Sequence, residues 1–341
     1  MTDRRQDERE SLHLDALRMA VIGVGRLGEA HARVLAGMDG VQLSGVYDVR
    51  EKRAEEVARR YGTTALDSLS RVADEADAAT VVVPTTAHCE VASFTLAKGL
   101  HTFVEKPIAA TVPEADRLIS LSESRGLVLQ VGHIERFNGA FRALEGMDIA
   151  PGFIEAHRLA SFDPRGTDVS VVHDLMIHDI DLILRLVRSD LASVDATGVA
   201  VISDQVDIAN ARMRFADGCV ANVTASRISL KKMRKLRIFQ RDHYVSMDFL
   251  AGESEIYRLI DDPGRAGARG LKIPVNTGDG RVRHITRQKT SKDRSEPLES
   301  ELASFVAAVR GDAPTPVTGF DGREALRVSL AVIEQIETNS R

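Results

Sequence analysis

The sequence predicts an α/β protein of two domains, with a doubly wound parallel sheet first and an α+β domain with an open, largely antiparallel sheet second. The chain has 341 residues, too many for one small core. Strand-like and helical apolar patterns alternate from residue 17 to residue 131, and a run of strand-like patterns follows a later helix. We therefore expect a tail at 1–15, a first domain at 16–138 and a second at 139–341, whose closing helices can pack back on the first.

The composition excludes several classes of protein. Apolar residues make up 43% and charged residues 28%, as in a soluble globular protein, and the net charge of −5 does not favour nucleic acid or anionic membranes. No apolar run reaches the roughly 18–20 residues of a membrane span, and residues 1–15 lack the apolar stretch of a signal peptide. Cys89 and Cys219 lie far apart without metal-ligand spacing. We expect a cytoplasmic protein that binds no metal, nucleic acid or membrane.

A glycine pattern near the start of the chain has the context of a dinucleotide-binding loop. The apolar run 17–22 predicts a buried strand that leads into Gly23-Val-Gly25-Arg-Leu-Gly28, and a helical pattern follows. Gly23 permits a tight turn, Gly25 lets a pyrophosphate approach the backbone, and Gly28 lets the helix pack closely on the strand. The helix N-terminus then offers free N–H groups and the positive end of its dipole to the phosphates.

An acid at the end of the second predicted strand indicates the cofactor. Asp48 follows the apolar run 41–47 and lies 25 residues beyond Gly23. A carboxylate at this place accepts hydrogen bonds from the adenosine ribose hydroxyls and repels a 2′-phosphate, so we expect NAD. Arg50 and Arg53 lie nearby and could serve a phosphate, which leaves NADP as the alternative.

Polar residues follow the later strands of the first domain. The predicted strands are 79–83, 101–104 and 127–131, and the predicted helices are 51–61, 89–98 and 113–125. Ligands of such a sheet bind outside the carboxyl ends of its strands. The residues that we expect there are Pro84, Thr85, Lys106, Pro107 and His133. We interpret His88 as a loop histidine near the cofactor.

A helix predicted from about residue 171 to residue 187 carries a candidate catalytic pair. Asp174, His178 and Asp181 fall at positions i, i+4 and i+7, away from the apolar stripe of the helix. A carboxylate one turn from an imidazole can fix its tautomer, which leaves the other nitrogen free to take a proton. From the helix alone, a solvated polar face is an equally good interpretation.

Strand patterns dominate the second domain. They cover 154–159, 193–202, 208–215, 219–227, 235–241 and 244–249, and 261–280 is expected to be irregular. Helices at 298–309 and 323–336 close the chain. One face of this open sheet would carry the 171–187 helix. The other face would be free, which suggests a homodimer or homotetramer that forms through the sheet.

The densest charge of the chain is a basic cluster between Arg227 and Arg237. A solvated strand edge or loop is one interpretation, because lysines at a strand edge discourage edge-to-edge pairing. A diphosphate clamp for a nucleotide sugar is the other, since guanidinium groups grip phosphate with two hydrogen bonds. We favour the first for most of the cluster and suspect Arg227, at a strand end, of a binding role.

Several motifs together resemble the glucose–fructose oxidoreductase/inositol dehydrogenase/rhizopine-catabolism (Gfo/Idh/MocA) family. They are Gly23-Val-Gly25-Arg-Leu-Gly28, Pro84-Thr-Thr-Ala-His88, Glu105-Lys106-Pro107, Asp174-Leu-Met-Ile-His178, the stretch 296–305 and Pro316-Val-Thr-Gly319. The resemblance runs nearly end to end. It implies a two-domain NAD(P)-dependent oxidoreductase that acts on a sugar, a cyclitol or a derivative. It also implies that Lys106, Asp174 and His178 are catalytic.

Two further stretches resemble the branch of the family that includes UDP-N-acetylglucosamine 3-dehydrogenases. They are Val131-Gly-His-Ile-Glu-Arg-Phe-Asn138 and the run 165–181. This implies oxidation at C3 of a UDP-N-acetylhexosamine and an aminotransferase as functional partner. The alternatives are a dehydrogenase of a free cyclitol or simple sugar and a non-catalytic NAD-binding regulator. The presence of the lysine, aspartate and histidine together disfavours the regulator.

The predicted binding residues fall into two sets. Those for the cofactor are Gly23, Gly25, Arg26, Leu27, Gly28, Asp48, Pro84, Thr85, His88, Glu105 and Lys106. Those for the substrate are Arg136, Asn138, Asp181 and Arg227. Arg136 and Asn138 could equally tie the junction of the two domains together.

Overall fold

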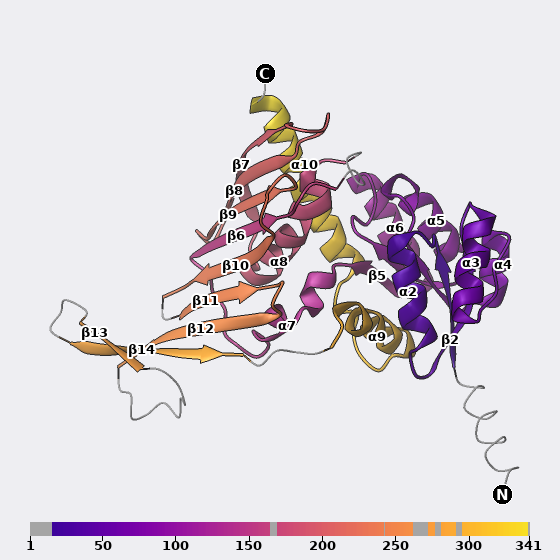
Figure 1. Cartoon of the computed structure of the whole chain (residues 1–341), viewed down its shortest axis with the longest axis horizontal. Helices are drawn as coiled ribbons and strands as arrows, with labels where there is room; N and C mark the ends of the chain where they lie inside the picture. Colours follow the sequence, from indigo (N-terminus) through magenta and orange to yellow (C-terminus); the bar gives the residue numbers. More distant parts are fainter. Residues whose placement is uncertain are drawn as a thin grey trace, which may run out of the picture. The chain divides into compact units, whose positions relative to one another are not determined.

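The computed structural model describes residues 16–163, 169–241, 243–261, 272–276, 281–290 and 295–339 (Figure 1). The chain divides into two compact units. The first runs to Ile134 and takes in Leu298–Leu326, and the second consists of Glu135–Pro297 and Arg327–Arg341. No helix among the described residues is long and apolar enough to span a membrane.

The first unit is a parallel sheet with helices on both faces. Its elements are β1 Leu17–Ile22, α2 Arg26–Ala36, β2 Val41–Tyr47, α3 Glu51–Tyr61, α4 Leu69–Glu75, β3 Ala78–Val81, α5 Thr85–Ala97, β4 His101–Glu105, α6 Val112–Arg125 and β5 Leu129–Gly132. The strand order is β2-β1-β3-β4-β5, and every pairing is parallel. A parallel bridge from Val46 to Ala65 extends the sheet beyond β2. The predicted doubly wound sheet is confirmed.

The helix boundaries of this unit follow from local chemistry, and α6 shows how. The Thr111 side chain accepts a hydrogen bond from the Glu114 N–H, and the Glu114 carboxylate accepts one from the Thr111 N–H in return. This capping box satisfies two donors that the first helical turn leaves without partners. Gly126 ends the helix with φ +63°, a left-handed conformation that costs glycine little.

Helix α9 (Pro297–Arg310) belongs to the first unit, although the sequence places it within the second domain's range. Its apolar face joins the core that α2 and α3 form with the sheet, where Leu302 and Phe305 are fully buried. The Phe305 ring meets Phe103 of β4 edge to face at 5.8 Å between centroids. The physical reason for the different boundary is therefore burial of an apolar helix face on this sheet.

The second unit is built on a nine-stranded sheet. Its elements are η1 Ile134–Phe137, α7 Gly139–Arg142, β6 Phe153–Leu159, η2 Val172–Met176, α8 Ile177–Val187, β7 Leu191–Val199, β8 Ile208–Phe215, β9 Val220–Ser226, β10 Met233–Phe239, β11 His243–Asp248, β12 Glu253–Ile260, β13 Lys272–Asn276, β14 Val282–Lys289 and the second part of α10 Gly319–Asn339. The order is β13-β14-β12-β11-β10-β6-β9-β8-β7. Among the described strands of this sheet, only β6 and β9 pair in parallel, so the predicted largely antiparallel sheet is confirmed.

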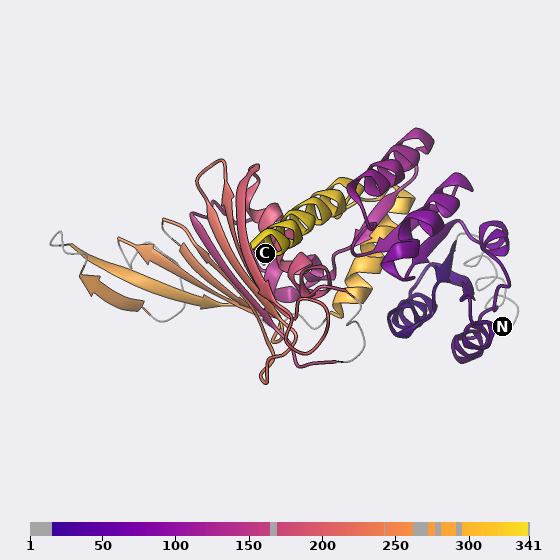
Figure 2. The ribbon, with the colours of Figure 1, turned by 90° about the horizontal axis from the view of Figure 1, so that it is seen from above.

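One face of the large sheet carries the helices. Figure 2 shows α8 and the second part of α10 against that face. Along β6 the side chains of Ile154, Ala156 and Arg158 are buried there, and those between them, such as Glu155, lie half-buried on the opposite face. No described helix of this unit covers the opposite face.

Two expectations from the sequence are incomplete. The region 261–280, expected to be irregular, contains β13, which pairs with β14 as an antiparallel ribbon. The short helix α4 and the strands β12 and β14 were not predicted. Ladder hydrogen bonds to β11 and β14 hold β12 on both sides, and such pairing compensates for a weak local pattern.

The approach of α10 to β5 gives a test of packing in the first unit. A Cβ on Gly322 would lie 2.7 Å from Val131 Cγ2, and valine has little freedom to turn away. We expect Gly322→Leu to destabilise the first unit by about 2 kcal/mol through overpacking, which lowers its melting temperature by roughly 4–8 °C. Phe320→Ala is the control, because this ring is 56% exposed and should change stability by less than about 0.5 kcal/mol. Equal melting temperatures for both variants would contradict the prediction.

Candidate functional site

The glycine turn between β1 and α2 leaves no room for side chains at two of its three glycines. Gly23 has φ +86°, and an added Cβ would lie 2.5 Å from the Val82 carbonyl oxygen. At Gly28 an added Cβ would lie 1.8 Å from the Gly23 carbonyl oxygen. At Gly25 an added Cβ would meet no atom within 4 Å. Gly23 and Gly28 are therefore required by the turn itself, and Gly25 keeps open the space in front of the helix.

Helix α2 begins at this open space. Its N-cap is Gly25, which has no side chain to bind the N–H groups of the first turn. Arg26 and Leu27 lie in that turn and are exposed. The free N–H groups and the positive end of the helix dipole suit a phosphate group.

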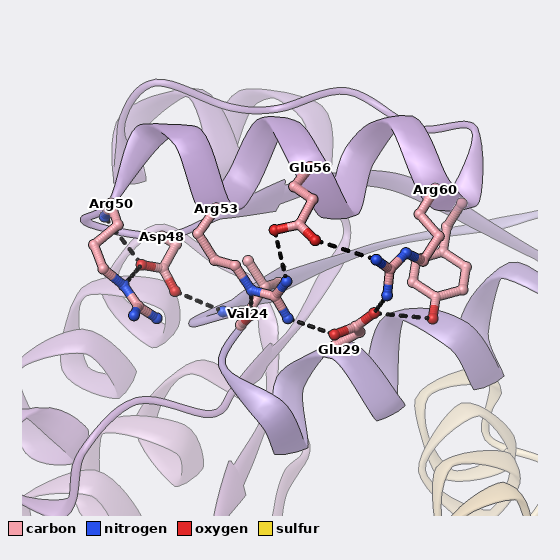
Figure 3. A network of polar contacts seen from close by, with 8 residues as sticks. Val24, Glu29, Asp48, Arg50, Arg53, Glu56 and Arg60 are labelled. Carbon is pink, nitrogen blue, oxygen red and sulfur yellow. Dashed lines mark hydrogen bonds and ion pairs between the residues drawn. The ribbon is translucent and has the colours of Figure 1, made fainter.

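Asp48 is held beside the glycine turn. Its carboxylate accepts hydrogen bonds from the Val24 N–H at 3.0 Å and from the Arg50 N–H at 2.9 Å (Figure 3). Burial alone would raise the pKa of the Asp48 carboxyl, but the hydrogen bonds from Arg50 and Val24 outweigh burial and keep this pKa below its ordinary value. Asp48 is therefore an anion, 9% exposed, at the end of β2.

Glu105 is fixed beneath the carboxyl edge of the sheet by a histidine that sequence reasoning missed. His31 of α2 is fully buried, and its Nε2 lies 3.2 Å from Glu105 Oε1. Glu105 Oε2 accepts a hydrogen bond from the Lys106 N–H at 3.1 Å. Burial opposes ionisation of Glu105, yet His31 and Lys106 keep its pKa below the ordinary value. The pair therefore fixes the backbone from which the half-buried Lys106 extends.

His88 lies in helix α5, so our interpretation of it as a loop histidine is wrong. Its side chain is only 1% exposed and links two strand-end loops. Its Nδ1 lies 2.7 Å from the Pro107 carbonyl oxygen and its Nε2 2.9 Å from the Val83 carbonyl oxygen. Burial lowers the pKa of His88, and the hydrogen bonds to the Pro107 and Val83 carbonyl oxygens oppose that shift. Pro84 is the N-cap of α5, and Thr85 is its first residue. His88 thus joins the loop before α5 to the loop after Lys106.

The candidate pair of the second unit lies on an irregular helix. Val172–Met176 form a π-helical turn, and the regular helix α8 follows from Ile177. The uniform α-helix expected here is therefore wrong at its start, where one wider turn contains Asp174. Both Asp174 and His178 are half-buried. π-turns of this kind occur often at functional sites.

Two arginines bind carboxylates of α8 that follow closely after His178. Arg158 of β6 donates to both oxygens of Asp179, at 2.7 and 2.9 Å. Arg136 of η1 donates to both oxygens of Asp181, at 2.8 and 2.6 Å. Both carboxylates are 1% exposed. Burial raises the pKa of Asp179, and Arg158 counteracts that rise. These paired hydrogen bonds set the rotation of α8 about its axis.

The candidate substrate residues are engaged within the second unit. Arg136 and Asp181 bind each other. The Asn138 side chain caps α7 and donates to Glu135 and to the Phe249 carbonyl oxygen, both at 3.0 Å. These contacts give Arg136 and Asn138 a structural role within the second unit, and the tie across the domain junction stays a prediction. Substrate contact by either residue stays a prediction.

Arg227 is also buried, with 4% of its surface exposed. Its guanidinium donates to Asp207 at 2.8 Å, to the Val169 carbonyl oxygen at 2.7 Å and to the Ser203 hydroxyl at 3.0 Å. Burial opposes ionisation of Asp207, but hydrogen bonds from Ser203, Ile202 and Arg227 keep its pKa far below the ordinary value. Arg227 therefore fixes the 201–207 loop and the chain just before η2.

The other members of the basic cluster separate along β10. Arg237 lies 2.8 Å from Glu155, Lys235 lies 3.4 Å from Asp248 and Arg234 lies 3.5 Å from Glu135. Lys231 and Lys232 are exposed. Lys235 and Arg237 form cross-strand ion pairs, because β10 pairs with β11 on one side and with β6 on the other. β10 is therefore an interior strand, and the solvated strand edge that we favoured is wrong for these residues. Only the loop part of that interpretation fits, for the exposed Lys231 and Lys232. Among the described residues, no group of three or more His, Cys, Asp or Glu side chains could hold a metal ion.

The grip of Arg136 on Asp181 can be tested through stability. Asp181→Asn removes the charge that compensates buried Arg136, and we expect a loss of about 3–5 kcal/mol from the stability of the second unit. Asp190→Asn removes an exposed carboxylate just beyond α8 and should cost less than about 0.5 kcal/mol. Urea unfolding followed by circular dichroism measures both. A loss below 1 kcal/mol for Asp181→Asn would show that the pair does not hold the helix.

Known proteins match this chain along nearly its whole length. Residues 17–133 match the model of an oxidoreductase family with an NAD-binding Rossmann fold, and residues 130–242 match the GFO/IDH/MocA C-terminal domain. UDP-N-acetylglucosamine 3-dehydrogenase of Acidithiobacillus ferrooxidans is 37% identical over 324 residues, which are 94% of this chain and 97% of that protein. Myo-inositol 2-dehydrogenase of Thermotoga maritima is 26% identical over 94% of this chain and 96% of that protein.

Solved structures agree with these matches. A structure of the Acidithiobacillus ferrooxidans enzyme superposes with a TM-score of 0.84, at 36% identity, over 95% of this chain and 98% of that one. Scyllo-inositol dehydrogenase from Lactobacillus casei, solved with NAD(H) and scyllo-inositol, gives a TM-score of 0.75 over 95% of this chain and 98% of that one; at 20% identity this shows the fold alone. The family matches and the identity to the first relative agree with the resemblance seen in the motifs. The chain belongs to the Gfo/Idh/MocA family of NAD-binding oxidoreductases.

Proposed function

We propose that this oxidoreductase oxidises a sugar hydroxyl to a ketone, at C3 of a UDP-N-acetylhexosamine, with NAD as the acceptor. The observation that carries the proposal is the 37% identity, over 94% of the chain, to a UDP-N-acetylglucosamine 3-dehydrogenase. The motif residues Lys106, Asp174 and His178 are all present, as a dehydrogenase requires and a regulator does not.

The first unit has the features needed to hold the cofactor. The space at Gly25 is open to a pyrophosphate, and the adjacent turn of α2 offers its N–H groups. The anionic Asp48 would accept hydrogen bonds from the adenosine ribose hydroxyls and repel a 2′-phosphate, which favours NAD over NADP. Pro84, Thr85 and Lys106 would bound the nicotinamide end, with His88 and Glu105 holding their loops. When bound, the cofactor supplies the hydride acceptor.

In the proposed mechanism, three side chains handle the proton and the charge of the reacting hydroxyl. His178 takes the hydroxyl proton as general base. Asp174, one turn away, orients the imidazole and stabilises its protonated form. The Lys106 ammonium donates a hydrogen bond to the reacting oxygen and stabilises the negative charge that develops on it.

A free cyclitol is the second candidate substrate, because the myo-inositol 2-dehydrogenase of Thermotoga maritima is 26% identical over 94% of this chain. Incubation of the protein with NAD and a panel of UDP-sugars, inositols and free sugars, followed at the absorbance of reduced cofactor, separates the two candidates. An aminotransferase in the assay traps a 3-keto sugar whose equilibrium is unfavourable. Reduction of NAD with inositols alone would overturn the proposed substrate.

We further propose a cytoplasmic homodimer or homotetramer that forms through the large sheet. The face without helices carries a row of rings from Phe153, Phe239, Tyr244 and Tyr257, with neighbouring centroids 5.0–5.6 Å apart. Aromatic side chains of this kind are enriched at protein interfaces. An aminotransferase that consumes the keto sugar is the proposed functional partner. Analytical ultracentrifugation gives the size of the oligomer, and a monomer at micromolar concentration would contradict the assembly.

The proposed catalytic group predicts non-additive effects. His178→Ala should lower kcat by roughly 10²–10⁴-fold and leave the affinity for NAD nearly unchanged, and Lys106→Met should also be slow. If the two side chains act on one oxygen, the double variant is scarcely slower than the slower single variant. Stopped-flow assays of NAD reduction measure all three. Near-normal turnover of His178→Ala would remove this residue from the mechanism, and fully multiplicative losses would separate its role from that of Lys106.

The glycine turn predicts two different losses. An alanine at Gly25 has free space in the protein, so Gly25→Ala should keep the wild-type melting temperature and weaken NAD binding by obstructing the pyrophosphate. Gly28→Ala forces a methyl group against the Gly23 carbonyl, so we expect it to lower both the melting temperature and the affinity. Calorimetric titration with NAD and thermal unfolding are the measurements. Unchanged affinity in Gly25→Ala would exclude the proposed place of the pyrophosphate.

A further inference from the structure

Arg53 of α3 lies at the edge of the proposed adenosine site. The Arg53 Nε donates to the Val24 carbonyl oxygen at 2.8 Å, and the Val24 N–H donates to the Asp48 carboxylate at 3.0 Å. Arg53 and Asp48 are therefore bound to the two sides of one residue in the glycine turn (Figure 3). A guanidinium at this place could grip a 2′-phosphate beside Asp48.

Two glutamates accept hydrogen bonds from the other two nitrogens of the guanidinium. Arg53 Nη2 donates to Glu29 of α2, and Arg53 Nη1 lies 3.0 Å from Glu56 of α3. With Val24 on Nε, each of the three nitrogens of Arg53 has an acceptor. The side chains of Arg53 and Glu29 are 21% and 19% exposed, so solvent screens this pair less than a fully exposed one.

Arg60 holds both glutamates in place. It binds Glu29 and lies 3.1 Å from Glu56, so each carboxylate bridges two arginines. The hydrogen bond from Arg53 is the largest effect on the Glu29 carboxyl, and it keeps the Glu29 pKa below its ordinary value. Glu29 is thus ionised at neutral pH. Its negative charge neutralises the Arg53 guanidinium, which the 2′-phosphate of NADP would otherwise attract.

We propose that Glu29 and Glu56 are specificity-determining residues, which exclude NADP by neutralising Arg53 and directing it away from the 2′-position. This inference rests on the proposed cofactor site and deepens it. The single carboxylate of Asp48 repels a 2′-phosphate, and the two glutamates remove the cation that would offset this repulsion. The Arg50 side chain, which is 68% exposed, donates to Asp48 from its Nε at 3.2 Å.

The test is the double variant Glu29→Gln/Glu56→Gln, titrated calorimetrically with NADP and with NAD. A charge-assisted hydrogen bond from the released Arg53 should tighten NADP binding about tenfold or more. Binding of NAD should change less than about threefold, because NAD has no 2′-phosphate for Arg53 to bind. The single variants are measured beside the double one, with thermal unfolding as the check on folding.

Two matched controls separate this idea from a general effect of charge. Glu55→Gln removes a carboxylate from the exposed side of α3, where the described structure shows no contact with Arg53. It should leave the ratio of NADP to NAD affinity unchanged. Adding Arg53→Gln to the double variant should abolish the gain in NADP affinity. A gain that survives Arg53→Gln, or one that Glu55→Gln reproduces, overturns the inference.

The outcomes also distinguish this inference from the proposed function. If the wild-type protein binds neither dinucleotide, the proposed cofactor site fails and the inference fails with it. If it binds NAD and the double variant gains no affinity for NADP, only the role of the two glutamates is overturned.

Discussion

The bidentate ion pairs on α8 are the constraint on which the geometry of the second unit depends. A buried arginine–carboxylate pair adds little net stability, because desolvation offsets most of its attraction. Removing one partner costs several kcal/mol of stability, however, because the other charge stays buried and unpaired. The pairs therefore favour one rotation of the helix about its axis. Asp179 and Asp181 bind arginines from β6 and η1 and thereby fix the direction of His178. A rotation that moved the imidazole would separate both buried carboxylates from the arginines that bind them.

The first unit supports its polar edge in a comparable way. The residues that we propose to bind the cofactor lie mostly in short loops at strand ends. Loops by themselves hold side chains less firmly than helices and strands do. Buried His31 and His88 bind these loops from beneath, one through Glu105 and one through two backbone carbonyls. Lys106 therefore extends from a backbone that is fixed on both sides.

The sequence predicts those features that depend on neighbouring residues. The glycine turn, Asp48 and the strand–helix alternation are local patterns, and the structure contains each of them. Contacts between distant positions leave no such pattern: His31 and Glu105 are 74 residues apart, and Arg136 and Asp181 are 45 apart. The π-turn at Val172–Met176 was not predicted, because its apolar spacing is also that of an ordinary helix.

Arg53 shows why charge alone does not determine cofactor preference. In the sequence it is a cation near Asp48 and leaves NADP open. In the structure each of its three nitrogens donates to an acceptor, Val24, Glu29 or Glu56, and the two carboxylates neutralise its charge, so it attracts a phosphate less strongly. Binding NADP would require either that Glu29 and Glu56 give up their contact with Arg53 and keep only Arg60, or that a phosphate lie beside three acids. Both cost free energy. Under the role proposed for Glu29 and Glu56, the pairing of Arg53, and not the number of arginines, would determine which dinucleotide binds.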